Sequence, residues 1–148
     1  MAQTTTATTT SAGTVEIKIA AATSYTNISG STNSVDQVTI ERVSGSKGTL
    51  DGDTQIIAAG RQVATMITVN CLYTEVTDEA LKITIASIKA GSNAVVQWKP
   101  VGSSGKSFTT ASGGKITKVS LPEFNSENGE PAVFSFELMC GGVDTSFA

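Results

Sequence analysis

The chain contains no histidine among its 148 residues. This absence removes Ser-His-Asp and Cys-His catalysis and zinc sites built on histidine. It also removes the side chain that most often changes charge near neutral pH. Aromatic residues make up only 5% of the chain, too few to predict a stacking platform for sugars or single-stranded nucleic acid. We therefore expect a protein that is not an enzyme.

Basic residues and cysteines are also scarce. Ten Lys and Arg stand against 13 Asp and Glu, for a net charge of −3, so no basic surface for gripping nucleic acid is expected. Cys71 and Cys140 lie in phase with apolar residues of strand-like segments, and we interpret both as buried, reduced thiols. The N-terminus lacks the pattern of a secretory signal, and the apolar runs are shorter than a membrane span. We expect no membrane association, no cofactor and no metal.

Threonine, serine, glycine and valine take the place of the missing charges, and β-branched residues favour strands. Apolar and polar residues alternate in several segments, as Val15, Ile17 and Ile19 do against Glu16 and Lys18. Such alternation is typical of half-buried strands. It predicts strands over residues 14–20, 36–43, 62–73, 93–100, 106–111, 115–121 and 131–140, with a shorter one over 24–29.

One segment, residues 77–90, has the period of a helix instead. Leu81, Ile85 and Ile88 form one apolar stripe, Thr77 is a suitable N-cap, and Gly91 is a suitable stop. The Ile-Thr-Ile run lowers helix propensity and leaves a strand as the alternative. The fold class expected is mainly β: a β-sandwich or partly closed barrel of about seven or eight strands with one flanking helix.

The predicted organisation is a single domain with flexible ends. Residues 1–13 are a low-complexity, Thr-rich arm that cannot bury enough apolar surface to order itself. Residues 14–142 form the β-sandwich domain, and residues 143–148 form a C-terminal tail. Within the domain, residues 44–61 are rich in glycine and turn residues and are predicted to form a long loop of the hairpin-connection type, with a brief extended piece over 54–58. Loops of this length are usually functional or disordered.

Two motifs suggest ligand sites and are better explained as turns. The segment 102–107, GSSGKS, matches the end of a phosphate-binding loop, but Pro100 stands where the first glycine belongs and β-like residues follow. Without a helix N-terminus no phosphate site is expected. The pair Asp51 and Asp53 flanks Gly52, and such Asp-Gly sequences build turns far more often than cation sites.

The order of elements resembles that of tail tube (major tail) proteins of long-tailed bacteriophages. A long central strand is followed by an acid-capped helix and then by the closing segment SLPEFNSENGEPAVFSFELMCGG. The resemblance covers residues 14–142 in architecture. Within the closing segment it rests on Glu123, Asn125, Gly129, Phe134, Phe136, Gly141 and Gly142.

The resemblance implies a structural subunit that assembles into hexameric rings, which stack into a tube with a hollow lumen. DNA would pass through this lumen during genome ejection without specific binding. The implied partners are copies of the chain itself and tape measure, terminator and baseplate or tip proteins. The implied location is the virion tail, assembled in the host cytoplasm. Two alternatives stay open: the tube protein of a contractile injection or secretion machine, and a capsid-decoration or other binding β-sandwich.

The same resemblance implies where the contacts lie, with no catalytic, cofactor or metal residues. The loop 44–61 would dock on the adjacent ring, and the strand near the C-terminus would join neighbouring subunits. Acidic residues on outward strand positions would line the lumen. The candidates for these three roles are, in turn, Gly45, Lys47, Asp51, Asp53, Ile56 and Ile57; Phe134, Phe136 and Leu138; and Glu16, Glu41 and Glu137.

Overall fold

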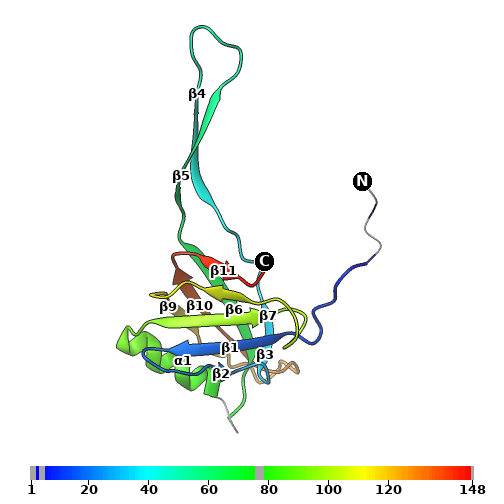
Figure 1. Cartoon of the computed structure of the whole chain (residues 1–148). Helices are drawn as coiled ribbons and strands as arrows, with labels where there is room; N and C mark the ends of the chain where they lie inside the picture. Colours follow the sequence, from blue (N-terminus) through cyan, green and yellow to red (C-terminus); the bar gives the residue numbers. More distant parts are fainter. Residues whose placement is uncertain (1–2, 4–5, 76–78, 148) are drawn as a thin grey trace.

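The computed structural model describes residues 3, 6–75 and 79–147, and within them it contains eleven strands and one helix (Figure 1). The elements in chain order are β1 (Thr14–Ile19), β2 (Thr26–Asn27), β3 (Thr32–Val35), β4 (Arg42–Lys47), β5 (Ile56–Gln62), β6 (Thr65–Leu72), α1 (Glu79–Ala90), β7 (Ala94–Lys99), β8 (Phe108–Thr110), β9 (Lys115–Ser120), β10 (Val133–Cys140) and β11 (Val143–Thr145).

The strands form two main sheets and a separate hairpin. Sheet A has the order β11-β8-β7-β1-β2, sheet B has the order β3-β6-β10-β9, and β4 pairs with β5 alone. Each named strand pair is antiparallel. The two sheets meet at a bridge between Asn93 and Lys115, but the described strands do not close into a barrel. The predicted class, a mainly β sandwich with one helix, is confirmed.

The core lies between the two sheets and is richest along β6 and β10. Their apolar residues alternate with polar ones, and period-2 alternation places every second side chain on one face. In the ladder, Phe134 pairs with Cys71, Phe136 with Val69, and Leu138 with Ile67. All six of these side chains are at most 2% exposed. Each large apolar side chain buried in this way contributes ~1.5–3 kcal/mol, so this ladder is the main source of stability.

The helix α1 packs against β9, and it ends where Gly91 takes a φ of 64°, which glycine adopts without steric cost. Its buried residues are Ala80, Thr84 and Ser87. Of the predicted stripe, Leu81 and Ile88 are partly buried and pack against the core beside these three residues, and Ile85 is half-buried. The Thr84 hydroxyl donates to the carbonyl oxygens of Ala80 (2.9 Å) and Leu81 (3.0 Å). The predicted N-cap at Thr77 lies outside the described residues.

Three segments differ from the sequence prediction. Residues 36–41 are not a strand; they are held by single backbone hydrogen bonds, from Asp36 to Thr68 and from Val63 to Glu41. The predicted loop 44–61 is mostly the β4–β5 ladder. The predicted tail contains β11, which pairs with β8. These strands and β3 bring the number of strands above the seven or eight expected.

Among the described helical residues, no helix is long and apolar enough to cross a membrane.

Candidate functional site

The hairpin formed by β4 and β5 projects far from the two sheets (Figure 1). Every residue of both strands is exposed, including Ile56 at 64% and Ile57 at 78%. An isolated two-stranded hairpin is at best marginally stable in water. Since consecutive strand residues point to opposite faces, Ile56 and Ile57 place apolar surface on both faces of the ribbon. The hairpin therefore presents a contact surface that its own subunit leaves uncovered.

All six residues predicted for the docking loop lie on this hairpin, and all are exposed. Gly45 pairs with Ala58 and Lys47 with Ile56 in the ladder. Asp51 and Asp53 lie in the connection between the two strands. The structure thus brings these residues together on one projecting element. Their role in docking on another ring stays a prediction.

The base of the hairpin is shaped by an irregularity in the ladder between Arg42 and Ser44. A Cβ atom on Gly60 would lie 3.1 Å from the carbonyl oxygen of Val43, so only glycine fits this approach without displacement. The Arg42 side chain crosses the same point, where Nη1 donates to the carbonyl oxygen of Gly60 at 3.0 Å. Close backbone packing at Gly60 fixes how the hairpin leaves the sandwich.

The free edges of the sheets are a second candidate contact surface. Sheet A ends in the two-residue β2 and the three-residue β11, whereas sheet B ends in β3 with four residues and β9 with six. Among the described residues, the outer edge of β9 pairs only at the bridge from Asn93 to Lys115. An unpaired edge offers backbone donors and acceptors to another chain. Sheet B has the longer edges, so it is better suited to continue across subunits.

The residues predicted for an intersubunit strand occupy a different place. Phe134, Phe136 and Leu138 lie on β10, which is paired on one side with β6 and on the other with β9. Their side chains are buried in the core of the subunit itself. Pairing between subunits cannot use a strand whose two edges are already occupied, so β3 and β9 take the place of β10 as candidates.

The three glutamates predicted for a lumen lie on different surfaces. Glu16 alternates with the buried Val15 and Ile17 on sheet A, and Glu137 alternates with buried residues on sheet B. The outer faces of two sheets in a sandwich point in opposite directions, so Glu16 and Glu137 cannot line the same channel. Glu41 lies at the base of the hairpin, where its carbonyl oxygen accepts from the Val63 N–H.

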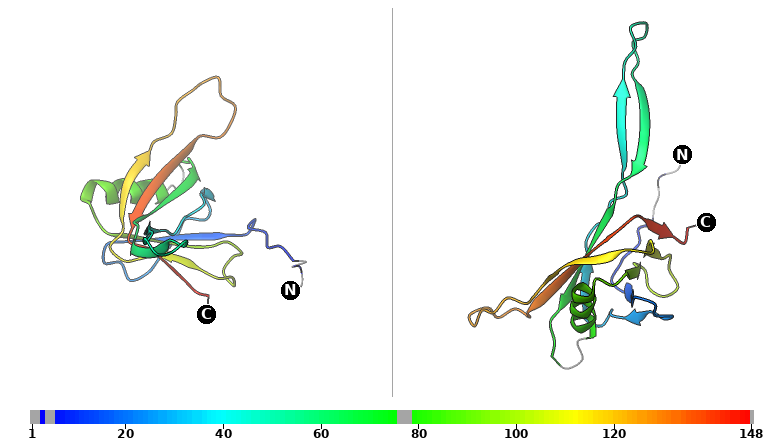
Figure 2. Two further views of the ribbon diagram at one scale, coloured as in Figure 1. Left: turned by 90° about the horizontal axis from the view of Figure 1, so that it is seen from above. Right: turned by 90° about the vertical axis from the view of Figure 1, so that its left-hand side faces the viewer.

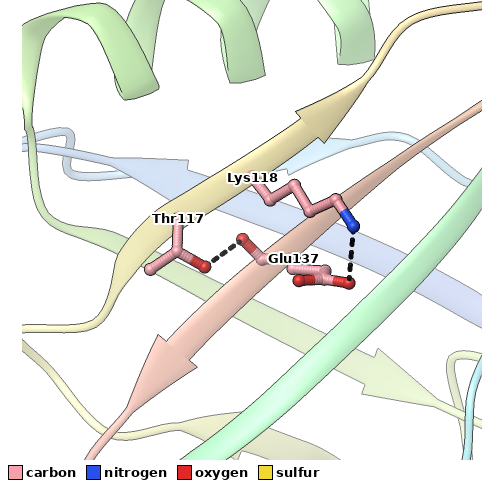
Figure 3. Close-up of polar contacts among 3 residues, drawn as sticks. All are labelled: Thr117, Lys118 and Glu137. Atoms are coloured by element: carbon pink, nitrogen blue, oxygen red, sulfur yellow. Dashed lines mark hydrogen bonds and ion pairs between the residues drawn. The ribbon is translucent and has the colours of Figure 1, made fainter.

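Glu137 is also partly neutralised by a neighbour. Its carboxylate lies 3.9 Å from the Lys118 ammonium, and its backbone oxygen accepts from the Thr117 hydroxyl at 3.5 Å (Figure 3). Ion pairs with this much solvent contact contribute little to stability. The pair does, however, reduce the net charge on the outer face of sheet B.

The outer face of sheet B is polar in its middle and apolar at its ends. In the β6–β10 ladder, the central pairs are Asn70 with Ser135 and Thr68 with Glu137. The pairs on either side, at the two ends of this face, are Leu72 with Val133 and Met66 with Met139, and these four side chains are exposed. The polar pairs separate the two apolar pairs, so the apolar side chains do not form one continuous patch along this ladder.

A groove of about 550 Å³ lies at the base of the N-terminal arm. The segment 32–40 forms one wall, and Trp98 stacks on Phe108 in another, with ring centroids 5.6 Å apart.

No group of three or more His, Cys, Asp and Glu that could hold a metal occurs among the described residues. The segment 102–107 is a connection between β7 and β8, with a strand rather than a helix after it.

No protein-family model matches the sequence, and no curated protein matches it. The solved structures that share the fold include the following three. A chain of the anti-feeding prophage baseplate, in a six-fold symmetrised structure, has a TM-score of 0.73 at 7% identity, over 98% of this chain and 97% of that one. A chain of the PVC sheath–tube complex, an extracellular contractile injection system in the extended state, has a TM-score of 0.70 at 18% identity, over 90% and 88%.

The third is a chain from the tail of an empty GTA particle with C6 symmetry, with a TM-score of 0.62 at 12% identity, over 91% of this chain and 94% of that one. Identities this low establish the fold alone. At that level the resemblance to tail tube proteins is confirmed, since the similar chains come from tails and contractile injection systems.

Proposed function

We propose that this protein is a structural subunit that assembles with copies of itself into the tube of a phage-like tail or contractile injection system. The observation that carries the proposal is the hairpin. All residues of its two strands are exposed, and its apolar side chains Ile56 and Ile57 are left uncovered by the subunit itself. The shared fold with chains of such assemblies over nine-tenths or more of this chain supports it. The proposed role is structural, not enzymatic.

In the proposed ring, β9 of one subunit pairs with β3 of the next. Within sheet B, β3 runs antiparallel to β6, β6 to β10, and β10 to β9, so β3 and β9 run in opposite directions. A rotation about a ring axis keeps this relation and allows an antiparallel ladder between neighbours. Closing the ring removes all free edges of sheet B. Six subunits are proposed because two of the similar structures have six-fold symmetry.

In the proposed tube, rings stack through the hairpin, which packs Ile56 and Ile57 against the adjacent ring. The outer face of sheet B then faces the lumen and presents Thr68, Asn70 and Ser135. A polar wall with little net charge suits passage of DNA without specific binding, as the resemblance implies for genome ejection. The similar chains from contractile injection systems support such a machine as the second candidate. The proposed location is the tail of a particle, assembled in the cytoplasm of the producing cell.

Electron microscopy of the purified protein in negative stain tests this proposal. Rings or tubes are expected, and native mass spectrometry of the rings should give a mass of six chains. Compact single particles at all protein and salt concentrations would contradict self-assembly. Closed rings of another size would contradict only the proposed number of subunits.

A further inference from the structure

The connection between β9 and β10, residues 121–132, carries two large apolar side chains into solvent. Phe124 is 95% exposed and Leu121 is 65% exposed. This connection, called the Phe124 loop below, also holds Glu123, Glu127 and Glu130 and no basic residue. A phenylalanine exposed to this degree gains nothing from its own subunit and is typical of a contact residue.

Hydrogen bonds within the loop hold its shape. The Asn125 side-chain oxygen accepts from the Glu127 N–H, and the Asn128 side-chain oxygen accepts from the Glu130 N–H, each at 3.0 Å. The Asn128 N–H donates to the Asn125 carbonyl oxygen at 3.2 Å. Such turns restrict the backbone before any partner binds. A preorganised loop loses less conformational entropy on contact, which favours binding.

The groove at the base of the N-terminal arm has the complementary properties. Its walls include Val15, Val35, Val38 and Trp98, which are apolar and only partly exposed or buried. The side chain of Lys99 is half-buried in the same wall, and no hydrogen bond or ion pair of its ammonium occurs among the described residues. The groove also contains Asp36, whose carboxylate accepts from the Asn70 amide at 2.8 Å. Lys99 is thus the cation available to an acidic partner.

The Phe124 loop follows β9, at one edge of sheet B, and the groove is lined by β3, at the opposite edge. The right view of Figure 2 shows the loop projecting from one side of the sandwich, with the C-terminus and the N-terminal arm on the other. The loop and the groove are complementary, but they are too far apart to contact each other within one chain. Copies of the chain can bring them together head to tail, and such contacts close into a ring when the rotation permits.

The proposed pairing of β9 with β3 brings the same two features together. In an antiparallel ladder, the end of β9 at Ser120 lies beside the start of β3 at Thr32 of the neighbour. The Phe124 loop begins directly after Ser120, and Thr32 lines the groove. Continuing the sheet therefore places the start of the loop beside a residue that lines the neighbour's groove.

We propose that Phe124 of one subunit inserts into the groove of the neighbouring copy in the same ring, where the glutamates of the loop lie near Lys99. The inference rests on the proposed ring and identifies a contact in addition to strand pairing. Aromatic side chains that fill a partner's groove commonly dominate the binding energy of an interface. Attraction between the glutamates of the loop and Lys99 at the edge of the groove favours this alignment of the two subunits over others.

Cross-linking between two single-cysteine additions tests the contact. Chains with Phe124→Cys are mixed with chains with Ile40→Cys, a groove residue that is 55% exposed, and the assembled sample is oxidised. The native Cys71 and Cys140 are buried and do not compete. Disulfide-linked dimers of the two variants are expected. Val38→Cys serves as a second groove position, and Leu50→Cys at the hairpin is the matched control that should give no link to the groove.

The outcomes separate this inference from the proposed function. Rings without a link from Phe124→Cys to either groove position would overturn the inference and leave the ring intact. A link from Leu50→Cys instead would show that the hairpin fills the groove, which also overturns it. No assembly of the unmodified chain under any condition would overturn both. As a second measure, Phe124→Ala should raise the protein concentration needed for ring formation about tenfold or more.

Discussion

In the body of the molecule, β6 and β10 bury alternate side chains almost completely, whereas in the hairpin β4 and β5 bury none. Both are antiparallel ladders of similar length, with six to eight residues in each strand. The backbone pairing is the same, so the difference lies in what the side chains cover. Net hydrogen-bond contributions are small, and the hydrophobic effect decides which ladder is self-sufficient.

The two ladders therefore have different roles in the subunit. The body holds itself together and supplies edges and a groove, while the hairpin adds little to the stability of its own subunit. A long exposed ribbon with apolar side chains is an aggregation risk. It is tolerable if a copy of the same chain covers it. Variants in one region that leave the other unchanged can test this difference.

The largest effect on stability is expected from Phe136→Ala in the core. Phe136 is fully buried, and removing an aromatic ring from such a site costs about 3–5 kcal/mol. Denaturant unfolding should show this loss in the free energy of unfolding. Phe124→Ala is the matched control, because Phe124 is almost fully exposed and its removal should change stability by no more than about 0.5 kcal/mol. Equal losses for the two variants would contradict the assignment of the core.

Two glycine substitutions compare the regions directly. A Cβ atom on Gly114 would lie 3.1 Å from the carbonyl oxygen of Ala94 and from side-chain atoms of Leu138 and Cys140. Gly114→Ala should therefore destabilise the body by about 1–3 kcal/mol through overpacking. On the hairpin, a Cβ atom on Gly45 would meet nothing within 4 Å, and Gly45→Ala should change stability by less than about 0.5 kcal/mol. Thermal unfolding of both variants measures the difference; a hairpin variant that melts as early as Gly114→Ala would contradict it.

A smaller effect is expected from Lys118→Ala. The Lys118 side chain is 62% exposed and lies at 3.9 Å from the Glu137 carboxylate, so the ion pair contributes at most about 1 kcal/mol. The stability should fall by no more than this amount, and high salt should reduce the difference from the unmodified chain. A larger loss that persists in high salt would show that the pair has a structural role on the face of sheet B.

The smallest effect on stability, with a large effect on assembly, is expected when Ile56 and Ile57 are both replaced by Ser. The two side chains are exposed in the single subunit, so unfolding should shift by less than about 0.5 kcal/mol. Stacking should be lost, because their apolar surface is proposed to pack on the adjacent ring. Sedimentation of assembled material measures the change. Tubes as abundant as those of the unmodified chain would count against the hairpin as the stacking element.

Much of the body could be predicted from the sequence because burial there produces a regular pattern. Phe134, Phe136 and Leu138 alternate with polar residues, and this period identified β10 and its buried face. The helix was located by its period and by Gly91, and Leu81 and Ile88 of the predicted stripe pack against the core. The most deeply buried helix residues, Ala80, Thr84 and Ser87, were missed because small or polar side chains give a weak hydrophobic signal.

The hairpin and the proposed contacts were harder to predict. The hairpin has no buried face, so Gly45, Ala58 and Gly60 carry no period from which a ladder could be inferred. Its position as a projecting element was expected only through the resemblance. The exposure of Phe124 depends on what the rest of the chain leaves uncovered, which no local pattern records. The same holds for the groove and for the edges of β3 and β9.

If the body forms rings and the hairpin stacks them, shortening the hairpin should abolish stacking and leave the rings intact. Residues 45–58 are replaced by Asn-Gly, a two-residue hairpin turn, between the paired residues Ser44 and Ala59. The shortened and full-length chains are then compared by electron microscopy under identical conditions. We predict tubes for the full-length chain and separate rings for the shortened one, with unchanged unfolding. Long tubes from the shortened chain, or loss of its rings, would contradict these roles of the hairpin and the body.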